Sequence, residues 1–193
     1  YSYNLALFVF ISGYFYKTDY EENVGKYIWK RTKRLLIPAY LWNIFYGGMV
    51  AFLGLFGFTI GAKPDLYNLF VMPFVDGEAF QYNLGSWFVY PLFLVCIINV
   101  LFRKFLKLIH LDNEFIVLIV YLAIGMIGIN TALENPTAIN GIVKLLVRTM
   151  FFLPCYEFGR FYKAVLEKKD TLNNVAYFAI IFVALLLVTY FPA

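Results

Sequence analysis

Long runs of apolar residues, separated by short polar segments, follow one another along the whole chain. Six runs can be distinguished, and most have roughly the 20 residues that a helix needs to cross a bilayer. They cover residues 3–16, 35–62, 84–102, 115–133, 142–159 and 175–191. The first run would reach only about 21 Å at 1.5 Å per residue, so we expect it to begin before Tyr1 or to be re-entrant. The pattern predicts an all-α fold, a polytopic membrane helix bundle with about six transmembrane segments.

Lysine and arginine are concentrated in alternate connections between these runs. The connections 17–34, 103–114 and 160–174 hold 13 of the 16 basic residues. Loops rich in these residues stay on the cytoplasmic side of a membrane. We therefore predict a multi-pass protein of the cell membrane with its basic loops in the cytoplasm. The segment 63–83 mixes prolines, glycine and acidic residues with aromatic ones, which predicts turns on the outer side that could cap a cavity.

The composition excludes an ordinary soluble domain. Hydrophobic residues make up 62% of the chain and charged residues only 15%, whereas soluble domains have about 45–50% and about 25%. The lipid bilayer is thus an expected partner, and the net charge of +4 is explained by the basic loops rather than by nucleic acid. Because the chain starts with Tyr1 and not with Met, we expect it to be truncated at its N-terminus.

The stretch KYIWKRTKRLLIPAY, residues 26–40, carries five cations just before an apolar run. On a regular helix Arg31 and Arg34 share a face. Paired guanidinium groups match phosphate oxygens well, so these arginines are candidates for binding a phosphorylated cytoplasmic ligand. The alternative is an attraction of the cluster to anionic lipid headgroups, about 1 kcal/mol for each cation.

Several charges are embedded in the fifth apolar run, and charge inside a membrane usually faces a protein interior or an aqueous cavity. Arg148 is the best candidate for a cavity, although pairing with Glu134 or with a headgroup is an alternative. Lys144 is close enough to the end of the run to reach the interface. Glu157 and Arg160 are three residues apart, so we expect them to pair with each other.

The remaining candidates have structural interpretations. Ser12 and Gly13 interrupt a bulky run, which indicates close approach of another helix. His110, the single histidine, lies in a basic loop and is interpreted as a solvated side chain. No metal ion or bound cofactor is expected.

Four segments in order, LALFVFISGYFYK (5–17), KRTKRLLIP (30–38), SWFVYPLF (86–93) and FFLPCYEFGRFYK (151–163), resemble the acyltransferase 3 superfamily. The likeness is strongest to the fucose 4-O-acetylase-like enzymes that modify bacterial surface glycans. It covers nearly the whole chain, so residues 1–193 are expected to form a single membrane-embedded domain.

The resemblance implies transfer of an acyl group, expected to be acetyl, from cytoplasmic acyl-CoA to a hydroxyl group of a cell-surface glycan or its precursor. It assigns the acyl-CoA phosphates to Arg31 and Arg34 and maps the family's tryptophan in the helix after the outer loop onto Trp87. Trp87 and, from its charge in an apolar run, Arg148 are the candidate pocket residues. The family's essential histidine would lie upstream of Tyr1, so no catalytic base is assigned within the chain. Transport of a glycan intermediate and a non-catalytic scaffold remain alternatives.

Overall fold

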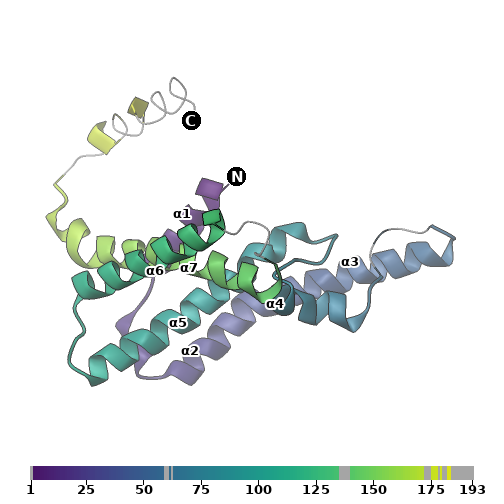
Figure 1. Ribbon diagram of the computed structural model, residues 1–193, viewed down its shortest axis with the longest axis horizontal. Helices are drawn as coiled ribbons and strands as arrows, with labels where there is room; N and C mark the ends of the chain where they lie inside the picture. The colour runs from purple at the N-terminus through teal and green to yellow at the C-terminus, as the bar shows by residue number, and fades with distance from the viewer. Residues whose placement is uncertain are drawn as a thin grey trace.

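The computed structural model describes residues 2–58, 61, 63–134, 140–171, 175–177, 179 and 182–183. Within these ranges all regular structure is helical (Figure 1). The α-helices are α1 (Ser2–Tyr14), α2 (Val24–Arg31), α3 (Ile37–Leu55), α4 (Met72–Val75), α5 (Val89–Leu108), α6 (Glu114–Glu134) and α7 (Gly141–Phe161). Shorter 3-10 or π-helical turns are η1 (Thr18–Glu21), η2 (Thr32–Leu36), η3 (Tyr67–Val71), η4 (Leu84–Phe88), η5 (Tyr162–Leu166) and η6 (Glu167–Lys169).

Three helical segments in the described part are long and apolar enough to cross a membrane: Val24–Leu55, Leu84–Leu108 and Glu114–Glu134. This confirms the prediction of an all-α membrane protein. α1 is apolar but shorter, and α7 has 21 residues that include several charges. The expected run 175–191 lies mostly outside the described residues, so the prediction of six crossings stays a prediction.

The basic segment is helical, which corrects the prediction of a loop over residues 17–34 and of an apolar span that starts at residue 35. One continuous helix of 32 residues begins at Val24, passes through the π-helical turn η2 and ends at Leu55. Its first part lies beside α5 in Figure 1, while α3 extends beyond the other helices. The cations of residues 26–34 are therefore placed alongside the bundle rather than in a connection.

Helix α7 lies at the centre of the bundle, where it packs against α1, α5 and α6 (Figure 1). Two glycines allow the closest of these contacts. A Cβ atom on Gly13 would lie 1.8 Å from the backbone oxygen of Tyr156, and one on Gly159 would lie 2.0 Å from that of Phe10. The prediction that Gly13 marks close helix packing is therefore confirmed.

The buried core joins α1, α2, α5, α6 and α7, and includes Val9, Tyr27, Cys96, Tyr121 and Tyr156. Large apolar side chains such as Leu41, Ile119 and Leu122 are half or more exposed on the outside of the helices. An exposed apolar surface of this extent is typical of a surface that contacts lipid.

The segment that precedes η4 packs against α3. The Asn43 side chain donates to the backbone oxygen of Leu69 at 2.8 Å. The Tyr67 hydroxyl donates to Asp76 at 2.7 Å, and this hydrogen bond to the carboxylate raises the pKa of Tyr67. These bonds hold residues 67–76 folded, and Asp76 directly precedes the contact that this segment makes with α7.

Candidate functional site

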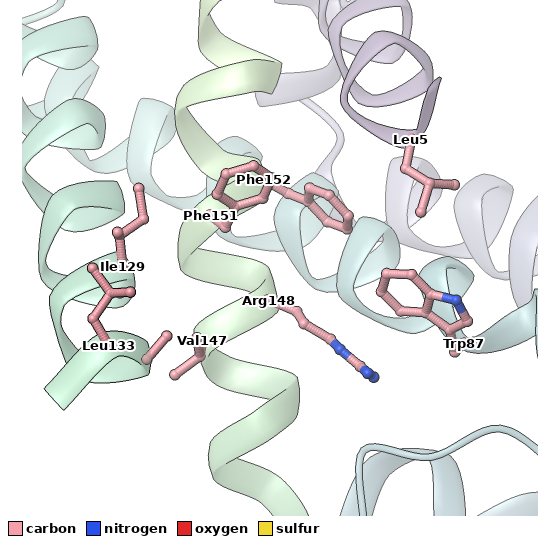
Figure 2. A pocket seen from close by; sticks show the side chains of 10 residues that line it. Leu5, Trp87, Ile129, Leu133, Val147, Arg148, Phe151 and Phe152 are labelled. Carbon is pink, nitrogen blue, oxygen red and sulfur yellow. The ribbon is translucent and has the colours of Figure 1, made fainter. Parts of the chain in front are cut away.

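Trp87 and Arg148 meet at one cavity, although they are 61 residues apart in the sequence. Trp87 lies on η4 and Arg148 on α7, and the guanidinium carbon stands 4.3 Å from the centre of the indole ring. This geometry is a cation–π contact. Figure 2 shows the Arg148 side chain directed away from α7 and toward Trp87. The structure thus places both predicted pocket residues at the same site.

The cavity has a volume of about 510 Å³, within the range usual for ligand pockets. Its walls come from α1, η4, α6 and α7, and apart from Arg148 they are almost wholly apolar. The lining residues are Leu5, Trp87, Gly128, Ile129, Ala132, Leu133, Val147, Arg148, Phe151 and Phe152.

The segment 63–83 contacts α7 beside this site. Arg148 donates a hydrogen bond to the backbone oxygen of Gly77 at 2.7 Å. Lys144, one turn earlier on α7, pairs with Glu78. Arg148 therefore bonds this segment instead of Glu134, its sequence-predicted alternative partner. None of the described residues that line the cavity comes from this segment, so the expected cap stays a prediction.

Arg31 is half-buried and faces the interior of the bundle. Its Nε atom donates to the Tyr27 hydroxyl at 3.1 Å, and the guanidinium lies over the Tyr27 ring at 5.2 Å. The Tyr27 hydroxyl is in turn 3.5 Å from that of Tyr156. The Arg31 guanidinium is thus in contact with a pair of buried tyrosine hydroxyl groups.

Arg34 is exposed and lines a different depression, of about 290 Å³, between the long helix and η4. The same depression is lined by Trp42, Asn83 and Ser86. Because the turn η2 has π-helical rather than α-helical hydrogen bonding, the regular three-residue spacing does not hold here. The spacing of Arg31 and Arg34 suggested a shared pocket, but the structure places only Arg34 at this depression.

Two polar side chains that the sequence did not single out, Asn83 and Ser86, line this depression. Asn83 donates to the Asn43 side-chain oxygen at 2.7 Å, and Ser86 donates to the Asn83 backbone oxygen at 2.8 Å. Asn43 is fully buried. An isolated Asn in an apolar run gave a weak signal, because the partner of Asn43 lies 40 residues away.

A second charged cluster lies at the opposite end of α7, where η1, α5, α6 and α7 meet. We call this the basic end, because the basic segments 103–114 and 160–174 of the sequence begin here. Arg103 is fully buried and bonds Glu157, Asp112 and Glu114, the last at 2.6 Å. Arg160 bonds Glu114 at 2.9 Å and Glu21 at 3.5 Å. The prediction that Glu157 and Arg160 pair with each other was wrong, because each finds a partner on another element.

His110 is exposed in the turn after α5, with a positive φ of 57°. This placement agrees with its interpretation as a solvated residue. Among the described residues, no group of His, Cys, Asp or Glu side chains is arranged to hold a metal ion.

The long apolar helices and the exposed apolar surface define a helical membrane protein. The family model described as an acyltransferase domain, Acyl_transf_3, matches residues 1–193, so the chain belongs to the acyltransferase 3 family. Neither the search of curated proteins nor the search of solved structures gave a match. The protein is a membrane acyltransferase in general terms, as the sequence predicted.

Proposed function

We propose that this protein is an O-acyltransferase that takes an acyl group, acetyl in the simplest case, from cytoplasmic acyl-CoA and transfers it to a hydroxyl group of a cell-surface glycan or its precursor. Family membership supports acyl transfer. The observation that carries the donor assignment is the depression that runs from Arg34 to Asn83 and Ser86, directly before Trp87. It holds an exposed guanidinium and the polar side chains of Asn83 and Ser86, and Ser86 is next in sequence to Trp87, which lines the other cavity.

In this proposal the Arg34 guanidinium contacts the phosphates of acyl-CoA, and the rest of the donor lies along the depression toward Ser86. A planar guanidinium binds phosphate oxygens through two parallel hydrogen bonds, which a lysine ammonium group cannot reproduce. Arg31 adds positive charge nearby, but its Nε atom is already bonded to Tyr27. In this proposal the depression beside Arg34 opens to the cytoplasm, because acyl-CoA is a cytoplasmic compound.

The chemistry requires a base that takes the proton of the acceptor hydroxyl while its oxygen attacks the thioester carbonyl. The carbon–sulfur bond then breaks, and coenzyme A leaves as a thiol after protonation. We do not assign this role to His110, the single histidine of the sequence. His110 is exposed at the basic end, whereas Ser86 and Trp87 lie near the other end of α5.

The test is acyl transfer by the full-length protein in proteoliposomes with acetyl-CoA as donor. Arg34→Lys should raise KM for acetyl-CoA at least roughly tenfold, a loss of about 1.4 kcal/mol. Arg31→Lys should have a smaller effect on KM, because Arg31 faces Tyr27. Lys33→Gln is the matched control, since Lys33 is an exposed neighbour whose ammonium group lies over Trp29.

If the role of this cluster is attraction to lipid headgroups, Lys33→Gln should impair the protein more than Arg34→Lys does. Arg34→Lys keeps its charge and would be silent, and Lys33→Gln would matter as much as Arg34→Gln. That result at equal protein abundance would reject the phosphate assignment.

A further inference from the structure

Arg148 differs from the other deeply placed arginines in its partners. Arg103 and Arg160 each bond two or more carboxylates. Among the described residues no carboxylate lies within ion-pair distance of Arg148, which is held by the Gly77 carbonyl and the Trp87 ring. Glu78, next to Gly77, is paired with Lys144. In the described part of the chain Arg148 therefore has no carboxylate of its own, and it shares the attraction of Glu78 with Lys144.

The Arg148 side chain is half-buried and starts inside the helical part of α7. Arg148 is seven residues from the first residue of α7, or about 10 Å at 1.5 Å per residue. Cations at such positions in membrane proteins mark binding sites, because their burial is unfavourable without an anion or polar partners. The missing partner of Arg148 is accordingly expected to be the anionic group of a ligand.

The walls of the cavity determine the rest of that ligand. Ile129, Leu133 and Val147 lie on the side of the site away from the Arg148 head group (Figure 2). A soluble sugar or a free phosphate ion would leave these apolar walls without a partner. A molecule with one hydrocarbon chain and one anionic head satisfies both parts of the site at once.

We infer that this cavity binds a single-chain lipid phosphate, with its hydrocarbon chain against α6 and α7 and its phosphate on Arg148. Guanidinium–phosphate pairs are strong, directional and favoured in surroundings of low polarity. Combined with the proposed function, on which this step rests, the acceptor is a glycan carried on a lipid phosphate. The lipid phosphate anchors it while the sugar hydroxyl group reaches the donor near Trp87.

The experiment uses the full-length protein in phosphatidylcholine nanodiscs and two photoreactive probes, farnesyl phosphate and farnesol, each with a diazirine on the chain. Adducts are located by mass spectrometry. The phosphate probe should label residues 128–133 and 147–152 at least roughly tenfold more than the alcohol at equal mole fraction. Arg148→Gln should bring this ratio to about one, and Arg148→Lys should leave part of it.

Two further variants distinguish binding of the hydrocarbon chain in the cavity from a general effect of positive charge. Ala132→Phe fills the cavity and should reduce labelling by both probes. Lys63→Gln removes an exposed cation elsewhere and should leave the ratio unchanged. Equal labelling by phosphate and alcohol in the wild type, or adducts only outside the two ranges, would overturn the inference.

Competition distinguishes a lipid-linked acceptor from an ordinary membrane lipid. Unlabelled farnesyl phosphate should compete at least tenfold better than phosphatidylglycerol, and equal competition would assign the site to bilayer lipids and overturn the inference. Acyl transfer is measured on the same samples. Binding without transfer would count against the proposed enzyme alone, and transfer without binding would count against the lipid phosphate alone.

Discussion

The arginines found near the two ends of helix α7 have opposite kinds of partner. At the basic end, Arg103 is enclosed by Glu157, Glu114 and Asp112. Toward the other end, Arg148 has a carbonyl oxygen, an aromatic ring and an apolar cavity. A buried charge that is matched within the protein serves the fold, whereas one that is left unmatched beside a cavity is available to a ligand. The same residue type thus has two different functions at the two ends of α7, with Arg103 supplied by α5 and Arg148 by α7 itself.

Of the substitutions that test this comparison, Arg103→Met should lower the stability of the protein most. It leaves Glu157, which is fully buried, without its cation. Removal of one partner from a buried ion pair costs about 3–5 kcal/mol. The free energy of unfolding, measured by denaturant titration in mixed micelles, should fall by that amount.

The double variant Arg103→Met, Glu157→Met provides the control. Apolar replacement of both members of a buried pair is often neutral, so much of the lost stability should return. If the double variant is less stable than Arg103→Met by several kcal/mol, the cost does not come from the unpaired carboxylate, and the role given to the basic end is wrong.

Gly13→Ala should lower the stability of the protein by an intermediate amount, because it disturbs the packing of α1 against α7. The added Cβ would lie 1.8 Å from the Tyr156 backbone oxygen, so α1 and α7 must separate. Overpacking of this kind costs about 1–3 kcal/mol. The same measurement should show the loss, and labelling of the cavity by farnesyl phosphate should weaken, because Leu5 on α1 forms part of its wall.

Gly48→Ala is the matched control for this substitution. A Cβ on Gly48 meets nothing within 4 Å, and Ala is preferred to Gly in a helix by about 1 kcal/mol. Its stability should therefore be equal to the wild type or higher. A loss similar to that of Gly13→Ala would show that helix contact is not the cause.

Arg148→Met should have the smallest effect on stability. It removes one hydrogen bond to Gly77 and one cation–π contact, and it also removes from an apolar site a charge that has no ion-pair partner among the described residues. These contributions oppose one another, and the free energy of unfolding should change by no more than about 1 kcal/mol. A loss comparable with that of Arg103→Met would remove the contrast between the two ends and make Arg148 a structural residue.

The sequence by itself determined the class of the protein. Its apolar runs and low charge predicted membrane helices, because hydrophobic segments of that length have no other stable environment. The order of four segments predicted the acyltransferase family, and the family match confirmed it. Local signals such as Gly13 were also read correctly, since small residues have few other reasons to interrupt a bulky helix.

Only the tertiary structure decided which charges meet. Periodicity paired Glu157 with Arg160 and placed Arg31 beside Arg34, but partners from η1, α5 and α6 and the π-helical turn η2 changed both outcomes. The contact of Trp87 with Arg148 joins segments 61 residues apart. Side-chain spacing along a helix fixes only neighbours on that helix, so the partners of a buried charge depend on how the helices pack.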